Sequence, residues 1–366
     1  KLFQVESVNI SDFKEVSSIE VEGDYLVTGE MYEGRDEIFL KVELSDMDTG
    51  LTIIEEVKSF TNKDEVVNYY RQKYIDDHTG YRLLFKTNNF AGPSYNLAWG
   101  DLKYGSLLVN QGSSLEIMSY NDELNLEYTI EKYNRTKYDD YNLVLGDVDN
   151  QAGAEIFAEN YNYPFQFTLN QSQDKINILK KFNRNRPKLI ANLNNNSYLI
   201  TRDYKGVLKF NLWQQEEFVT DFKIQIGKNE GYRIGLSDLD GNQQQELIIT
   251  SYQDEKGYRL KIYDLDYKLK AQLDKILGAE FAIGNLNANQ RPEIYSYYKQ
   301  NNKLLAFEWQ DNKYQEIWQS KKLSEDIVDL TIGDINRDGK LELLVLVNNG
   351  DQSKIYVYDY KTVNDD

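Results

Sequence analysis

Short runs of apolar residues bounded by Gly, Asn and Asp recur along the whole chain. Two of them, YRIGLSD (232–238) and QELIITSY (245–252), flank an Asp-rich loop. A third, YRLKIYDLD (258–266), follows a short turn, and a fourth run lies near 268–276. These runs are rich in Ile, Leu, Val and Tyr and lack the helical period of about 3.6 residues. The pattern therefore predicts a unit of four β-strands.

This four-strand unit repeats, and each copy carries a small residue followed by Asp or Asn after its first strand. The pairs are Gly23 with Asp24, Gly100 with Asp101, Gly146 with Asp147, Ala191 with Asn192, Ser237 with Asp238, Gly284 with Asn285, and Gly333 with Asp334. From Gly100 onward the small residues are 46, 45, 46, 47 and 49 positions apart. The step from Gly23 to Gly100 is 77 positions, so it carries an insertion of about 30 residues.

Four strands in a repeat of this length are typical of a propeller blade. We therefore expect an all-β fold in which residues 1–366 form a single seven-bladed β-propeller. The last unit offers only three strands, which end with KIYVYDY (354–360), whereas KLFQVESV (1–8) has no blade of its own. We predict that this N-terminal segment adds the outer strand of the last blade, because sharing a blade between both termini closes the ring and removes an open edge.

The insertion over residues 59–93 separates the first blade from the second. Its segment TNKDEVVNYYRQKY (61–74) predicts a helix, since it begins with capping residues and its apolar side chains line one side. A connection from an outer strand to the next inner strand falls on the face opposite the Asp-rich loops, and such loops often carry function. The candidates for ligand contact are Tyr69, Tyr70, Tyr74, His78, Tyr81 and Phe90. The alternative is a cover that only packs Val66 and Tyr70 against the blades.

Composition narrows the classes of function. The chain has 42 basic and 60 acidic residues and a net charge of −18, which repels phosphate backbones and disfavours nucleic acid as a partner. It has no Cys and a single His, His78, which excludes disulfides, thiolate nucleophiles and Cys-ligated zinc. No apolar run is long enough to span a membrane. The chain begins with Lys1 instead of Met, so we expect a monomer that is secreted or displayed at a cell surface after loss of an export signal or anchor.

The Asp-rich loops resemble those of FG-GAP and VCBS repeats, which occur in integrin α-subunit propellers and in many bacterial surface proteins. The clearest copy is IGDINRDGKLELLVL (332–346), and AGPSYNLAWGD (91–101) retains a Gly-Pro before an inner strand. The resemblance extends roughly from residue 16 to 360, outside the insertion. It implies a loop of the form Asp-x-Asp-x-Asp-Gly-x-x-Asp between the first two strands of a blade, in which calcium has a structural role.

Calcium takes about six to eight hard oxygen ligands, which a tight acidic turn can supply. The loop 334–342 offers Asp334, Asn336, Asp338, the carbonyl of Lys340, and Glu342 in place of the family's final Asp. The loop 238–246 offers Asp238, Asp240, Asn242 and Glu246, and the loop 147–155 offers Asp147, Asp149, Gln151 and Glu155. Asn dominates the loops 285–293 and 192–196, which we expect to bind no metal. The alternative for every loop is an Asx-turn whose side chains bind their own backbone amides.

No catalytic constellation is evident in the sequence. It contains no Gly-rich phosphate loop, nucleophile elbow or metalloprotease motif. The four tryptophans, which we expect to pack between blades, are Trp99, Trp213, Trp309 and Trp318.

We therefore predict a non-catalytic binding or scaffolding propeller of a bacterial surface, with an extracellular protein or a glycan as its ligand. The alternative is a carbohydrate-active enzyme, a polysaccharide lyase or hydrolase that uses carboxylates and Tyr in the central funnel. Clustered ionisable groups with perturbed pKa on the face of the insertion would favour the enzyme, and a Tyr-lined face without them would favour binding.

Overall fold

The structure is a computed structural model that describes residues 17–20, 25–33, 38–46, 52–60, 80–87, 90–91, 93–102, 105–111, 114–121, 123–131, 142–148, 154–160, 163–170, 175–181, 185–254, 257–289, 291–310, 313–350 and 352–361. The chain divides into two compact units. One consists of Lys1–Thr79 with Val363–Asp366, and the other of Gly80–Thr362.

The first unit contains a four-stranded antiparallel sheet with the strand order β1-β2-β3-β4. Its strands are β1 (Ser17–Glu20), β2 (Tyr25–Glu33), β3 (Ile38–Asp46) and β4 (Thr52–Phe60). The segment expected to form the first blade falls in this unit, so it is no part of the ring described next. Gly23 and Asp24 themselves lie outside the described residues.

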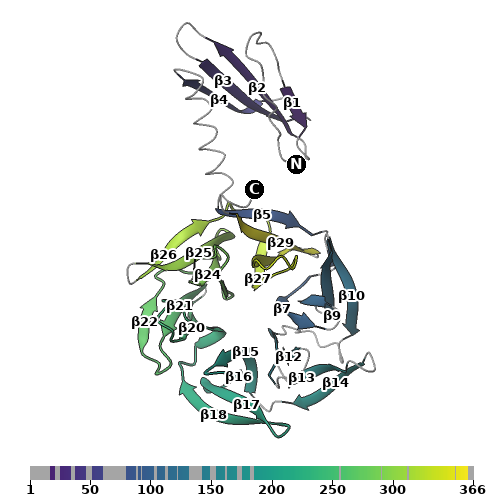
Figure 1. Cartoon of the computed structure of the whole chain (residues 1–366), viewed down its shortest axis with the longest axis vertical. Coiled ribbons are helices and arrows are strands. Elements are labelled where there is room, and N and C mark those ends of the chain that lie inside the picture. Colours follow the sequence, from purple (N-terminus) through teal and green to yellow (C-terminus); the bar gives the residue numbers. More distant parts are fainter. Residues whose placement is uncertain are drawn as a thin grey trace. The chain divides into compact units, whose positions relative to one another are not determined.

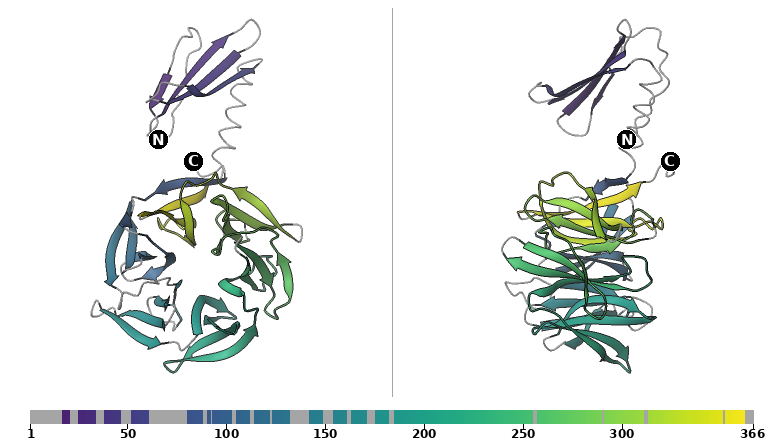
Figure 2. Two further views of the ribbon diagram at one scale, coloured as in Figure 1. Left: turned by 180° about the vertical axis from the view of Figure 1, so that it is seen from behind. Right: turned by 90° about the vertical axis from the view of Figure 1, so that its left-hand side faces the viewer.

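The second unit is a ring of antiparallel sheets, each with its first strand at the centre (Figure 1). Seen from the side, the sheets of this unit overlap in a layer that is narrower than the ring seen face-on (Figure 2). Five of them are four-stranded blades.

The bounds of the blades follow the repeat in the sequence. The first two blades contain β7 (Asn96–Leu102), β8 (Gly105–Asn110), β9 (Ser114–Asn121) and β10 (Glu123–Glu131), then β11 (Asn142–Gly146), β12 (Glu155–Asn160), β13 (Tyr163–Asn170) and β14 (Lys175–Lys181). The third contains β15 (Asn185–Leu193), β16 (Asn196–Asp203), β17 (Val207–Gln214) and β18 (Glu217–Gln225). The fourth and fifth contain β19 (Glu230–Ser237), β20 (Glu246–Asp254), β21 (Gly257–Tyr263) and β22 (Leu269–Gln272), then β23 (Ala282–Gly284), β24 (Glu293–Tyr298), β25 (Lys303–Gln310) and β26 (Lys313–Gln319).

A sixth sheet closes the ring with strands from both ends of the unit. It has the order β27 (Asp326–Gly333), β28 (Glu342–Asn349), β29 (Gln352–Lys361) and β5 (Gly80–Lys86), and β6 (Phe90–Ala91) also pairs with β29. The guanidinium of Arg82 on β5 donates to both carboxylate oxygens of Asp359 on β29, at 2.8 and 2.7 Å. This paired contact adds a side-chain link to the backbone ladder.

Two fold predictions are wrong, and a third falls on residues that the structure does not describe. The ring does not have seven blades, since the second unit contains five four-stranded blades and the closing sheet. The outer position on β29, which was predicted for residues 1–8, is held by β5, and residues 1–8 themselves lie outside the described residues. The helix expected over 61–74 lies outside the described residues, which contain no helix at all and hence none that could cross a membrane. The miscount arose because the strands of the first unit have the length of blade strands, and the sequence pattern does not record which strands pair.

The recurring small residue has a packing role between blades. A β-carbon at Gly100 would lie 2.7 Å from Leu145 on the next inner strand, and one at Gly146 would lie 3.0 Å from Ile190. At Gly333 it would lie 2.1 Å from the Trp99 ring, across the junction between the closing sheet and the first blade. The small residue therefore makes room for a large side chain of the neighbouring sheet, and Trp99 packs between sheets as predicted.

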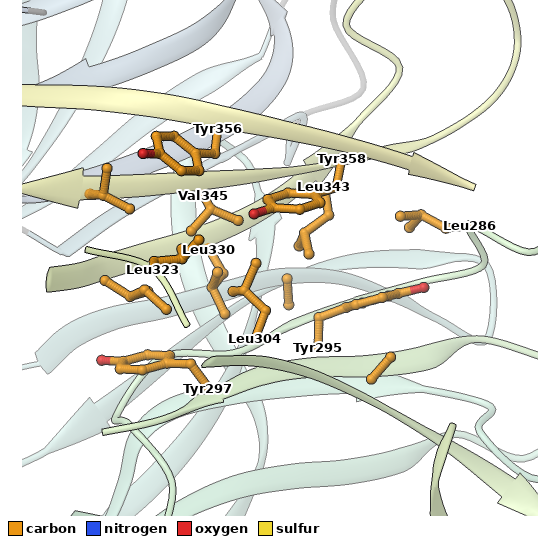
Figure 3. Packing of buried hydrophobic residues seen from close by; sticks show 14 residues of the cluster. Leu286, Tyr295, Tyr297, Leu304, Leu323, Leu330, Leu343, Val345, Tyr356 and Tyr358 are labelled. Atoms are coloured by element: carbon orange, nitrogen blue, oxygen red, sulfur yellow. The ribbon is translucent and has the colours of Figure 1, made fainter. Parts of the chain in front are cut away.

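The core lies between adjacent sheets. Figure 3 shows the cluster between the fifth blade and the closing sheet, where Tyr295 and Tyr297 of β24 pack near Leu330, Val345 and other side chains of β27 to β29. Apolar side chains of this cluster are almost completely buried. This packing makes the inner strands a rigid wall around the centre of the ring.

Candidate functional site

The six inner strands β7, β11, β15, β19, β23 and β27 line a central cavity of about 230 Å³. Most of its lining residues are aliphatic, Leu97, Val144 and Ile283 among them, but about half of the surface that faces the cavity is polar, and the lining includes Lys188 and Arg233. Five of the six inner strands, all except β7, lead into an Asp- or Asn-rich loop of their sheet. The start of the inner strands therefore marks the opposite end of the channel.

Polar and charged residues gather near that starting end. We call them the channel belt: Asn96, Lys188, Arg233, Glu280 and Asp329. Four of them stand four positions before the small residue of their repeat, and Lys188 is the extra residue of a bulge between Pro187 and Leu189. All are largely buried, and Asp329 is 0% exposed.

Arg233 lies between the two acidic members of the channel belt. Its Nε is 3.4 Å from Oε2 of Glu280, and its Nη2 is 3.9 Å from Oδ1 of Asp329. The backbone N–H groups of Leu97 and Leu330 each donate to Asp329 at 2.8 Å. Asp329 thus links the closing sheet to the first blade, and a buried carboxylate with these partners is well satisfied.

Glu280 is less well satisfied than Asp329. Its Oε2 accepts no hydrogen bond from the described residues, although it lies in an ion pair with the Arg233 guanidinium. Burial raises the pKa of Glu280 to about 7, with Asp329 adding to the rise and Arg233 opposing it. Burial likewise raises the pKa of Asp329. Glu280 therefore changes its charge near neutral pH.

The sequence did not single out the channel belt. Of its candidates for ligand contact, Tyr69, Tyr70, Tyr74 and His78 lie outside the described residues. Tyr81 lies on β5, where its ring packs against Trp318 and Tyr360 and its hydroxyl is 3.1 Å from that of Tyr295. Phe90 packs in the core between the closing sheet and the first blade. Neither described candidate lines the cavity. An available signal was a charged residue four positions before the small residue in three otherwise apolar strands.

The loop 334–342 uses its carboxylates to bind its own backbone. Asp334 accepts from the N–H groups of Asp338 and Gly339 at 3.0 and 2.9 Å, and Asn336 accepts from Asp338 at 3.0 Å. Asp338 accepts from Lys340 at 2.8 Å. This is the Asx-turn arrangement that the sequence offered as the alternative to a calcium site. Calcium would have to replace several of these amide donors, so its binding stays a prediction.

The loop 238–246 gathers three carboxylates. Single oxygens of Asp238, Asp240 and Glu246 lie within 4.8 Å of one another, which fits a small cation. The Lys270 ammonium, however, lies 2.7 Å from Asp240 and 2.6 Å from Glu246. A lysine cation therefore already neutralises part of this group, and a metal ion would have to displace it.

The last acid of each loop has a shared structural role. Oε2 of this glutamate accepts the backbone N–H seven positions earlier, at 2.8 to 3.0 Å, in the pairs Glu155 with Val148, Glu246 with Leu239, Glu293 with Leu286, and Glu342 with Ile335. The Asn-rich loop that ends at Glu293 makes the same contact, so the loop shape does not depend on acidic residues elsewhere. In the loop 147–155, Asp149 and Gln151 lie outside the described residues. Asp147 does not belong to a cluster of three potential metal ligands among the residues that are described.

Comparison with known proteins adds little beyond the fold. No protein-family model matches the chain, and no curated protein matches its sequence. Among solved structures, the β-propeller domain of Cps50 (Swd1) from Myceliophteria thermophila is 12% identical, with coverage of 96% of this chain and 99% of that one and a TM-score of 0.44. The soluble aldose sugar dehydrogenase from Escherichia coli is 11% identical, with coverage of 76% and 99% and a TM-score of 0.48. BBS1N, solved in complex with ARL6DN, is 13% identical, with coverage of 95% and 92% and a TM-score of 0.42. Likeness at this level concerns the fold alone.

Proposed function

We propose that this chain is a non-catalytic binding propeller whose ligand site is the belt end of the central channel. The observation that carries the proposal is the convergence of Lys188, Arg233 and Glu280 from three different blades beside a cavity that both aliphatic and polar residues line. A concave, mostly apolar pocket with a few convergent polar groups is the usual form of a ligand site. The rigid packing of the inner strands holds these groups in place before a ligand arrives.

The satisfied state of Asp329 favours binding over catalysis. Glycoside-cleaving enzymes use two carboxyl groups in different roles. Here Asp329 is engaged by two backbone amides and by Arg233, so it serves the junction between sheets. Glu280 is the other carboxyl group of the channel belt, and it is buried and paired with the same guanidinium.

The wider setting of the proposal comes from the sequence. The resemblance of the loop 334–342 to FG-GAP and VCBS repeats supports an exported protein at a bacterial surface, with calcium as a structural ligand of that loop. The ligand would then be an extracellular protein or a glycan. A net charge of −18 supports a partner other than nucleic acid.

A carbohydrate-active enzyme is the second candidate, and the observation in its favour is the ionisation of Glu280. A carboxyl group whose pKa lies near 7 beside a cavity has the property of a general acid or base. This meets the criterion of clustered ionisable groups that distinguishes an enzyme from a binding protein. Polysaccharide lyase or hydrolase activity is therefore tested together with binding.

The variant Glu280→Gln separates the two functions, because it keeps the shape of the side chain and removes its charge. We expect the protein to capture a ligand from a screen of glycans and extracellular proteins without converting it. At pH 8, the variant should bind that ligand about tenfold more weakly, since a hydrogen bond to a charged group contributes about 1.5–3 kcal/mol. Glu217→Gln, an exposed change on the outer strand β18, is the control.

Binding is measured by calorimetry, and product formation is measured by chromatography. Product that forms with the native protein and disappears with Glu280→Gln would establish the enzyme instead. Equal affinity of the native protein and both variants would exclude the channel belt as the ligand site.

A further inference from the structure

Three tyrosine rings of the fourth blade form a surface patch, which we call the tyrosine platform. Tyr232 and Tyr252 are 48% and 43% exposed, and Tyr258 is half-buried between them. The ring centroid of Tyr258 lies 5.3 Å from that of Tyr232 and 5.4 Å from that of Tyr252. Neighbouring exposed rings of this kind are uncommon on a surface without a partner and mark an interaction site.

The tyrosine platform adjoins the channel belt. The Lys188 ammonium of the channel belt lies 5.9 Å from the centroid of the Tyr232 ring. Burial, followed by the charge of Glu280, raises the pKa of Tyr258. The rings and the charged groups therefore form one continuous surface at this end of the channel.

The charges on this surface argue for an uncharged ligand. Lys188 and Arg233 carry two positive charges, and Asp329 with the partly ionised Glu280 carries between one and two negative charges, so the local charge is close to zero. The Lys188 ammonium already lies near the Tyr232 ring and would repel a second cation there. The net charge of −18 on the whole chain repels a polyanion.

A neutral sugar chain matches each of these groups. The C–H face of a pyranose ring packs on an aromatic ring, and tyrosine presents such a face at a low cost in side-chain entropy. Lys188 and Arg233 can donate to sugar oxygens.

We infer that the tyrosine platform and the channel belt together bind a neutral oligosaccharide, with sugar rings on Tyr232 and Tyr252 and hydroxyl groups at Lys188 and Arg233, which line the cavity. The inference rests on the proposed binding function and names its ligand class and contact residues. It places the sugar across the mouth of the channel instead of between blades.

The test is calorimetric titration of the full chain with neutral hexasaccharides of glucose, xylose, mannose and N-acetylglucosamine. Oligogalacturonate and a Lys-rich peptide serve as charged comparators. The double variant Tyr232→Ala with Tyr252→Ala removes both rings, whereas Tyr232→Phe with Tyr252→Phe keeps them. Tyr204→Ala removes another exposed tyrosine, in the turn after β16 of the third blade, and is the control.

We expect at least one neutral hexasaccharide to bind, and the alanine pair to bind it about tenfold more weakly or worse. The phenylalanine pair and Tyr204→Ala should stay within about twofold of the native protein. The single variant Tyr252→Ala should lose less affinity than the alanine double variant. It allows the same comparison with the native protein if the double variant is misfolded.

The inference is overturned if none of the neutral sugars binds, if a charged comparator binds more tightly, or if the alanine pair binds as well as the native protein. Capture of a protein partner that depends on Glu280 would leave the binding propeller standing and reject only the sugar. Loss of every ligand would reject both.

Discussion

At the residue scale, the same side chains can hold either a metal ion or their own loop. Asp334 and Asp338 stand at the spacing of a calcium loop, yet their oxygens accept from backbone amides in the same turn. An Asx-turn and a calcium loop need the same residue types at the same spacing, so the sequence left both open. The decisive partner in the loop 238–246 is Lys270, which stands 24 positions after Glu246 and could not be paired with it from the sequence.

The variant Lys270→Met tests how much this ammonium contributes. It leaves the carboxylate of Glu246, whose side chain is 2% exposed, without its counter-charge. We expect the free energy of unfolding to fall by about 1–3 kcal/mol, less than for a fully buried pair because Lys270 is partly exposed. Millimolar calcium should restore part of the loss, because it can occupy the place of the ammonium.

The measurement is chemical denaturation with and without calcium, and Lys268→Met, which removes the exposed partner of Asp266, is the control. An unchanged unfolding curve for Lys270→Met would show that the ion pair does not contribute. Equal curves with and without calcium would remove the metal prediction for this loop.

At the scale of elements, the repeat predicted most of the ring but not its ends. Six small residues from Gly100 to Gly333 each lie on an inner strand. At the glycines, a large side chain of the neighbouring sheet occupies the space that a β-carbon would need, so one small residue recurs in each sheet at nearly even spacing. The outer strand of the closing sheet was missed because β5 (Gly80–Lys86) carries no such residue with a following Asp or Asn. The channel belt was missed for another reason, since its members come together only when six strands from distant segments meet.

Truncation of the chain before or after β5 distinguishes closure of the ring by β5 from closure by residues 1–8, which the sequence predicted. A variant that begins at residue 80 keeps β5 and β6, so it should unfold cooperatively. A variant that begins at residue 92 loses the ladder on β29 and the contact between Arg82 and Asp359. Its midpoint of thermal unfolding should fall by about 10 °C or more, because the exposed edge of β29 is left unpaired.

Thermal unfolding followed by circular dichroism provides the measurement. Similar midpoints for both variants would show that β5 is dispensable. Loss of folding on removal of residues 1–79 alone would show that the ring depends on the first unit.

At the scale of the whole molecule, buried acids fall into two opposing groups. Burial raises the pKa of Glu280, Glu293 and Glu342 to about 7. Burial acts on Glu230 in the same direction, but hydrogen bonds from Lys261 and Tyr267 outweigh it and lower its pKa to about 2. Hydrogen bonds from Lys354, Ser324 and Tyr356 likewise lower the pKa of Glu325 to about 2 against the effect of burial. The two groups respond to pH in different ranges.

We therefore expect the folded state to be most stable near pH 5. The three acids with raised pKa stabilise the fold below their unfolded pKa of about 4.5, and this contribution is lost as the pH rises to about 7. The two acids with lowered pKa contribute above about 4.5, and their contribution is lost only as the pH falls towards 2. The free energy of unfolding should thus decrease by a few kcal/mol, in order of magnitude, between pH 5 and 8.

Urea denaturation at steps from pH 4 to 9 measures this dependence. The triple variant Glu280→Gln, Glu293→Gln, Glu342→Gln should flatten the decline between pH 5 and 8. Stability that rises over this interval in the native protein would contradict the assignment.

The pairing of β5 with β29 also sets the order of events during synthesis. The two strands are joined across nearly the whole unit, from Gly80 to Lys361, so the ring cannot close until the ribosome has made almost the entire chain. Until then the growing propeller exposes unpaired strand edges, which are prone to aggregate. The open edge of the growing propeller is therefore removed only when β29 has been made and has paired with β5.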